Sequence, residues 1–360
     1  MKRLFCFKII AAAFSLILIT SCSSSSVYDK VYPTLNDGKY DSEFPYRNSS
    51  TQLENISNSV KLVNSIAFYT SYLFNESDKI RAVGISGLNF EKVAYEKVFF
   101  NRTASGTATL INKDQGQVAL LTVAHVVSFP DTIISFFVNQ DGSLSNYVQS
   151  ISIKSKQTNY VTDLPDNGEI EILAIDKVND LAILGRSYKV EQTLKLVPFS
   201  YPWGESSELE WGSFVYVFGY PMNFKMVTKG IVSSPAKEKN YFLIDAAYNR
   251  GFSGGIVLAI RDGVPNFELV GLVKSVPADF TYTVRPMQRE HDLDYNPMIP
   301  YKGEVYVDKE QVLRPGITKV IDIEVVKEFI ENNKQELISK GYYLKDFFSA
   351  PSQLKLKEVH

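Results

Sequence analysis

Residues 248–255 read Tyr-Asn-Arg-Gly-Phe-Ser-Gly-Gly and place Ser253 in a turn with glycines on both sides. Glycine reaches backbone conformations that other residues rarely adopt, so this turn can expose the serine hydroxyl and direct successive N–H groups toward one point. An oxyanion hole requires that arrangement. Flexible turns have the same composition, however, so the stretch gains meaning only from the rest of the chain.

Two other stretches carry reactive side chains at the edges of apolar strands. His125 ends the run Leu-Thr-Val-Ala-His, and Asp180 directly precedes Leu-Ala-Ile-Leu. Taken alone, His125 is explained as a strand-end residue and Asp180 as a turn residue, although a carboxylate buried there needs polar partners. Along the chain, the three residues follow the order His, Asp, Ser. Chymotrypsin-like barrels have this order, whereas subtilisins and α/β-hydrolases do not.

The sequence around these stretches is typical of a β protein. After Asp78, short β-branched and aromatic runs alternate with Gly, Asn and Asp, as in 80–86, 93–100 and 271–276. Many short strands at this spacing predict a barrel or a sandwich. Near the end, Asp322 precedes an apolar-periodic segment that closes before Gly341, which predicts a C-terminal helix.

Five motifs in this order resemble those of the trypsin-like peptidase superfamily, and most closely its bacterial HtrA/Deg branch. The match covers about residues 100–275. It is carried by Thr122-Val-Ala-His125, Asn179-Asp180-Leu-Ala-Ile-Leu, Phe218-Gly-Tyr-Pro221 with Thr228-Lys-Gly-Ile-Val-Ser233, Asp245-Ala-Ala247, and Asn249-Arg-Gly-Phe-Ser253-Gly-Gly.

The resemblance implies a mainly β fold of two six-stranded β-barrels, with an N-terminal and a C-terminal helix added. It implies that Ser253 attacks the scissile carbonyl, that His125 takes and returns the proton, and that Asp180 fixes the imidazole tautomer. The backbone N–H groups of Gly251 and Ser253 would form the oxyanion hole. The implied activity is serine endopeptidase hydrolysis, which needs neither a cofactor nor a metal.

The chain departs from the family pattern at several positions. Phe252 stands where digestive members carry an aspartate and HtrA members commonly an asparagine, so activation by a new N-terminus is excluded. Ala108 replaces a usual glycine and Ile256 a usual proline. After Gly341 too little sequence remains for the PDZ module that the HtrA branch usually adds.

The resemblance also suggests a specificity pocket formed by Ala247 at its base and Val273, Lys274 and Ser275 in its wall. Because Ala247 carries no charge, we expect cleavage after small or medium apolar residues. Lys274 offers an alternative, since its ammonium group would favour an acidic residue.

The N-terminus has the features of an export signal. Lys2, Arg3 and Lys8 precede a short apolar run, and Cys22 follows a small residue as in a bacterial lipobox. We therefore expect a lipoprotein signal peptide at 1–21 and a lipid on Cys22, although an ordinary cleaved signal remains the alternative. The only other cysteine, Cys6, would be removed, so the mature chain has no disulfide partner.

We divide the rest into a flexible tether (22–50), an amphipathic helix (51–76), a peptidase domain (79–345) with an insertion (277–304), and a tail (346–360). The helix is predicted from Leu53, Ile56, Val60, Val63 and Ala67. It either packs on the domain or binds a partner. The insertion is read as a surface loop, with a lid or an exosite as the alternative, and its His291 as a solvated residue.

With 38 basic against 40 acidic residues, the chain gives no electrostatic case for binding nucleic acid. The expected partners are protein or peptide substrates and, through the lipid on Cys22, a membrane. The expected location is the periplasmic or surface face of a bacterial cell envelope. Two alternatives to the peptidase remain: a catalytically inactive or latent lipoprotein that binds proteins on the same fold, and a structural lipoprotein whose triad is coincidental.

Overall fold

The computed structural model describes residues 36–45, 47–139, 141–235, 240–247, 249–275, 278–286, 298, 305–313 and 316–344. The predicted signal peptide, Cys22, the first part of the tether, His291 and the tail lie outside the described residues. Within the described ranges, no helix is both long enough and apolar enough to cross a bilayer.

The first barrel is an antiparallel sheet that closes on itself. Its strands follow the order β1-β2-β3-β7-β6-β5, β5 pairs again with β1, and β4 lies beside β5. The strands are β1 (Val60–Leu73), β2 (Glu96–Asp114), β3 (Gln117–Thr122), β4 (Thr132–Val138), β5 (Leu144–Val161), β6 (Glu169–Asp176) and β7 (Leu181–Ser187).

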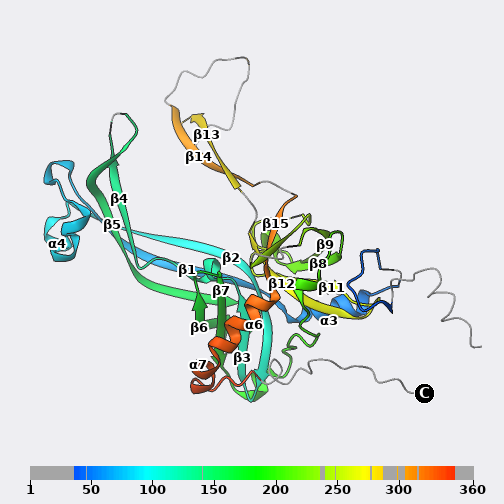
Figure 1. The fold of residues 1–360 in the computed structure, drawn as a ribbon. Helices are drawn as coiled ribbons and strands as arrows, with labels where there is room; N and C mark the ends of the chain where they lie inside the picture. Colours follow the sequence, from blue (N-terminus) through cyan, green and yellow to red (C-terminus); the bar gives the residue numbers. More distant parts are fainter. Residues whose placement is uncertain are drawn as a thin grey trace, which may run out of the picture.

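The second barrel is closed by six antiparallel strands in the order β10-β15-β12-β11-β8-β9. These are β8 (Phe214–Gly219), β9 (Met226–Ser234), β10 (Tyr241–Ile244), β11 (Ile256–Ile260), β12 (Phe267–Ser275) and β15 (Thr318–Asp322). The predicted pair of six-stranded barrels is therefore confirmed, and Figure 1 shows the two barrels side by side.

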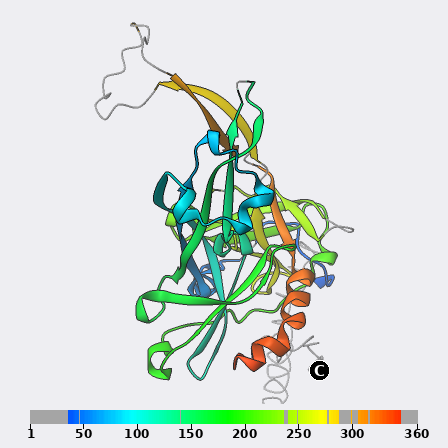
Figure 2. The same cartoon turned by 90° about the vertical axis from the view of Figure 1, so that its left-hand side faces the viewer.

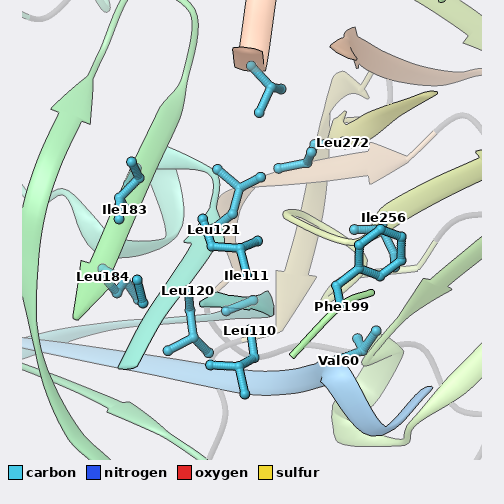
Figure 3. Close-up of a cluster of buried hydrophobic side chains, with 14 of the residues drawn as sticks. Val60, Leu110, Ile111, Leu120, Leu121, Ile183, Leu184, Phe199, Ile256 and Leu272 are labelled. Atoms are coloured by element: carbon cyan, nitrogen blue, oxygen red, sulfur yellow. The ribbon is translucent and has the colours of Figure 1, made fainter. Parts of the chain in front are cut away.

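One hydrophobic cluster runs through the first barrel and across to the second. Figure 3 shows Leu121 and Ile183 of the first barrel beside Leu272 and Ile256 of the second, all fully buried. Strands β3 and β7 are buried on both faces, which explains why their sequences are continuous apolar runs. A separate cluster fills the second barrel. The facing sides of the two barrels are thus held together by a shared core.

The predicted helix 51–76 is wrong beyond its first part. Helix α3 covers Ser50–Ser59, and the chain then enters β1, so the first barrel begins before the predicted domain boundary at residue 79. In β1, alternate residues from Val63 to Ser71 are buried. Two of them are serines, Ser65 and Ser71, and they hide the period of two from a hydrophobicity pattern. Pairing with both β2 and β5 stabilises the strand.

The predicted tether 22–50 is also wrong over its described end, which packs on the second barrel. Tyr40 is buried there and its hydroxyl donates to Glu268 over 2.6 Å. The N–H of Asp41 donates to the carbonyl of Ile260, and its own carbonyl accepts the N–H of Phe214. A buried tyrosine with a hydrogen-bonded hydroxyl stabilises a fixed segment, which the polar composition of this stretch conceals.

The C-terminal helix is confirmed, in two pieces. α6 (Ile323–Asn332) and α7 (Lys334–Ser339) meet at Asn333, and Gly341 follows with a φ of +87°. Val326, Phe329 and Ile330 of α6 are buried in the shared cluster. Asp322 occupies the N-cap position, although its side chain makes no capping hydrogen bond.

We expect Asp322 to make stability depend on pH. Burial, with a contribution from Glu324, raises the pKa of Asp322 to about 7, whereas a carboxyl in an unfolded chain titrates near 3.9. Between these values the folded protein binds more protons, so its free energy of unfolding falls as pH rises. Asp322→Asn should therefore raise the melting temperature at pH 8, and the gain should shrink toward pH 5. A gain that is the same at both pH values would contradict this.

Two projections leave the barrels. The predicted insertion 277–304 belongs to a longer excursion whose ends are paired strands, β13 (Ala278–Pro286) and β14 (Val305–Leu313). In the second projection, the outer halves of β1, β2, β4 and β5 form an arm that carries α4 (Phe90–Val93) at its end (Figures 1 and 2). A small cluster around Phe74 and Ile80 gives the end of the arm its own core.

Candidate active site

His125 is presented by the first barrel, directly after β3. It lies in the one-turn helix α5 (Ala124–Val127), whose other residues Ala124, Val126 and Val127 are buried and fix the turn against the barrel. The His125 side chain itself is 45% exposed. The sequence placed His125 at a strand end, and the structure adds the short helix that turns its ring away from the core.

Asp180 holds this histidine by two hydrogen bonds. Its Oδ2 lies 2.9 Å from Nδ1 of the imidazole, and its Oδ1 accepts the backbone N–H of His125, also at 2.9 Å. The carboxylate fixes the ring and its tautomer, because Nδ1 must carry the proton to donate to it. Asp180 has a φ of +65°, a conformation that aspartate tolerates better than most residues. This backbone turn directs the carboxylate toward α5.

Ser253 lies in the turn between β10 and β11 of the second barrel, and its neighbours anchor it to the first. The backbone carbonyl of Ser253 accepts the N–H of Thr107 over 2.7 Å. Thr107 also donates through its hydroxyl to the carbonyl of Gly251 at 2.7 Å and accepts the N–H of Tyr220 at 2.9 Å. Thr107 of β2 therefore joins the Ser253 turn to the other barrel, a role that its sequence motif did not reveal.

Two sets of contacts connect the surroundings of Ser253 with those of His125 and Asp180. A side chain on Gly106 would lie 2.6 Å from Val126, the neighbour of His125, and 2.8 Å from the Ser253 carbonyl, so only glycine fits between them. On the other side, the Ser253 hydroxyl donates to the carbonyl of Lys274 over 3.4 Å, and the Lys274 ammonium lies 4.0 Å from Oδ2 of Asp180. Gly106 and Lys274 thus link the Ser253 turn to the segments that carry His125 and Asp180.

The turn preceding Ser253 has the backbone conformation that its glycines allow. Gly251 has a φ of +108°, and a Cβ there would lie 2.2 Å from the carbonyl of Tyr220. The Arg250 carbonyl accepts the N–H of Met222 at 2.9 Å. Because the C=O and N–H of a trans peptide point in opposite directions, the Gly251 N–H is directed away from Met222. This orientation suits an oxyanion donor.

Phe252, the departure noted from the sequence, is a core residue. Its side chain is 3% exposed and belongs to the cluster that fills the second barrel. A Cβ on Gly219 would lie 2.6 Å from the Phe252 ring, which shows how closely β8 packs on it. Hydrophobic burial of Phe252 therefore holds this turn.

With this geometry established, comparison with known proteins identifies the domain. Residues 106–272 match the family described as the trypsin-like peptidase domain. These residues form a trypsin-like peptidase domain. The region includes all three predicted triad residues and both barrels' contributions to their interface. Members of this family are generally serine hydrolases.

Among solved structures, the chain is similar to a thermostable serine protease, AL20, from an extremophilic microorganism. The identity is 9%, the match covers 77% of this chain and 98% of that chain, and the TM-score is 0.36. No curated protein matches the chain. The family match and the observed fold therefore carry the assignment.

The predicted pocket residues of the peptidase domain are only partly brought together. Lys274 and Ser275 end β12 next to Ser253, and Ala247 is exposed just after β10. Val273, however, is fully buried and its side chain packs in the core of the second barrel. Its contribution is through the backbone, since its N–H donates to the carbonyl of Gly255 and its carbonyl accepts the N–H of Gly254, both at 2.8 Å.

A cavity of about 270 Å³ lies behind the Asp180 turn of the peptidase domain, between β6 and α6. It is lined by Asp176 and Asn179 on one side and by Phe329 and Asn333 on the other, and it includes none of the predicted triad residues. Hydrogen bonds from Asn179 and Val178 lower the pKa of Asp176 despite its partial burial. Asp176 thus shapes the turn that positions Asp180.

Proposed function

We propose that this protein is a serine endopeptidase of the HtrA/Deg type, which hydrolyses peptide bonds through an acyl-enzyme intermediate. The observation that carries this proposal is the Asp180 carboxylate, which is bound to both Nδ1 and the backbone N–H of His125. A catalytic histidine needs this orientation, because its other ring nitrogen must then be the proton acceptor. A structural histidine would not need a buried carboxylate on both groups.

In the proposed mechanism, Ser253 attacks the scissile carbonyl while Nε2 of His125 accepts the hydroxyl proton. The backbone N–H groups of Gly251 and Ser253 stabilise the negative oxygen of the tetrahedral intermediate. His125 then returns the proton to the leaving amine, and a water molecule repeats the sequence to release the acyl group. Before the attack, the Ser253 hydroxyl has to leave the 3.4 Å contact with the Lys274 carbonyl. No cofactor enters this scheme.

The proposed specificity follows from the neutral side chain of Ala247, which favours small or medium apolar residues before the cleaved bond. Lys274 supports the alternative preference for an acidic residue, but its ammonium group lies 4.0 Å from Asp180 and is engaged there. We therefore favour the apolar preference. The proposed substrates are proteins of the cell envelope or extracellular proteins.

The proposed location rests on the sequence of the N-terminus. The charged start, the short apolar run and Cys22 are typical of a bacterial lipoprotein signal peptide. Attachment through lipid on Cys22 would hold the protein on the periplasmic or surface face of the membrane. The docked segment around Tyr40 would then leave residues 22–35 as the link to the membrane.

A latent or purely binding form is the second candidate, because Lys274 contacts both Ser253 and Asp180. The Ser253 hydroxyl donates to a carbonyl, and the Lys274 ammonium lies near the same Asp180 oxygen that accepts from His125. A protein that stayed in this arrangement would bind polypeptides without cleaving them.

Labelling by a fluorophosphonate probe separates these candidates. In the full-length protein in detergent, we expect covalent labelling of the wild type and of Ser233→Ala, an exposed serine of β9, and none of Ser253→Ala. The probe reacts only with a serine whose proton has an acceptor and whose oxyanion has donors. A folded wild type that stays unlabelled would reject the peptidase in favour of the latent form.

A further inference from the structure

The outer half of β2 is an open sheet edge that begins at the candidate active site. From Lys97 to Ser105 this strand pairs with β1 on one side only, and β3 joins the other side from Thr109 onward. Within the described part of the chain, no strand pairs with that outer edge. In Figure 1 the edge borders the arm on the side of the β13–β14 hairpin.

The direction of each backbone group along this edge follows from Thr107. Its N–H donates to the Ser253 carbonyl, while Leu62, its partner on β1, accepts the N–H of Thr162 instead. Thr107 thus points its N–H and C=O away from β1. The register between β1 and β2 is continuous, so every second residue does the same. These residues are Ser105, Thr103, Asn101, Phe99 and Lys97.

Open edges are normally protected by proline, by a bulge, by shortening or by charged side chains, because unpaired backbone groups invite another strand. The outer half of β2 contains no proline, its pairing with β1 has no register shift, and its charged residues between 97 and 105 are Lys97 and Arg102. The strand from Lys97 to Ser105 spans roughly 27 Å at the usual rise. Phe99 and Val98 are exposed on it, so apolar side chains of a partner would find contacts on both faces.

We infer that this edge binds the part of the polypeptide substrate that follows the cleaved bond, by adding it as an antiparallel strand. β2 runs from Lys97 toward Thr107 and the Ser253 turn. A strand antiparallel to it therefore has its amino end at Ser253 and leaves along the arm. Such a strand is the segment on the carboxyl side of the scissile bond. This inference rests on the proposed peptidase function.

The edge favours unfolded or extended protein segments over short peptides. Backbone pairing is independent of sequence. The affinity would therefore rise with the length of the substrate segment, because every second residue adds hydrogen bonds through its N–H and C=O. Residues close to the cleaved bond would still decide where the chain is cut. The substrate class is accordingly an extended polypeptide with at least eight residues after the cleavage point.

The test uses two peptides with the same cleavage sequence, chosen from a library with the wild-type protein, that carry two or ten residues after the cleaved bond. We expect the long peptide to have at least a tenfold higher kcat/KM, mainly through KM. N-methylation of successive residues in its downstream part should lower kcat/KM at every second position. Thr103→Pro removes an N–H that points away from β1, a substitution that an edge strand can accommodate. It should bring the ratio of the kcat/KM values for the two peptides close to one. Thr103→Ala keeps the N–H and should keep the ratio.

Fluorophosphonate labelling and the melting temperature of each variant establish that the fold and the serine are intact. Labelling with equal kcat/KM for both peptides would overturn this inference alone. Equal effects of Thr103→Pro and Thr103→Ala on the kcat/KM ratio of the two peptides would also overturn it. So would a wild-type dimer that Thr103→Pro converts to a monomer, since the edge would then pair with a second copy of the chain. Absence of labelling and of cleavage would overturn the proposed function, and this inference with it.

Discussion

Asp180→Asn should lower turnover by about four orders of magnitude while leaving the protein folded. Both carboxylate oxygens of Asp180 accept hydrogen bonds, one from the His125 backbone and one from Nδ1. An asparagine retains one acceptor and presents an NH₂ group in place of the other. The imidazole then takes the tautomer in which Nδ1 is the acceptor, and Nε2 can no longer take the proton of Ser253. Asparagine tolerates the positive φ of this residue, so the turn survives.

The measurement is steady-state kinetics on a library-derived peptide, with Asp141→Asn as the matched control. Asp141 is an exposed carboxylate in the turn between β4 and β5, where it accepts hydrogen bonds from the backbone N–H and the hydroxyl of Ser143. Its variant should stay within tenfold of the wild type. Turnover of Asp180→Asn within tenfold of the wild type would show that the His–Asp pair takes no part in catalysis.

Gly251→Ala should lower turnover by about two to three orders of magnitude, because it displaces a proposed oxyanion donor. Its φ of +108° is unfavourable for alanine, and the added methyl group would lie 2.2 Å from the Tyr220 carbonyl. To relieve that clash, the peptide between Arg250 and Gly251 must rotate. The Arg250 carbonyl of this peptide is bonded to Met222, and the Gly251 N–H points the opposite way. The rotation turns the N–H out of that direction. Stability should fall as well.

Gly212→Ala separates strain from catalysis. Gly212 has a φ of +85°, but a Cβ there meets nothing within 4 Å, and the residue lies in a turn of the second barrel away from Ser253. This variant should melt at a lower temperature, because the left-handed conformation costs an alanine residue about 1–2 kcal/mol. It should keep wild-type turnover. Wild-type turnover in Gly251→Ala as well would exclude its N–H from the oxyanion hole.

The motifs around the predicted triad could be recognised from sequence because each depends on neighbours in the chain. Ser253 needs the glycines beside it, and His125 and Asp180 stand next to apolar strands whose burial is evident from their composition. The two barrels were expected from the family resemblance that these motifs carry. The C-terminal helix was predicted for the same reason, since its apolar residues recur at helical spacing and glycine ends it.

Prediction failed where a segment takes its structure from distant partners. Val60, Val63 and Ala67 recur at helical spacing, but β2 and β5 pair with this segment on both edges and make it a strand. Its buried serines kept the period of two hidden. Likewise, the stretch around Tyr40 has a polar, irregular composition, and only Glu268 and Ile260 of the second barrel give it a fixed place.

The sequence by itself determined the fold class and the identity of the three residues at the proposed site. Only the tertiary structure decided how that site is supported. Thr107 holds the Ser253 turn from the other barrel, the Lys274 ammonium lies near Asp180, and the outer half of β2 is left open. These contacts join residues far apart in the chain, and they form only when the shared core packs the two barrels together, so no local pattern carries their signal.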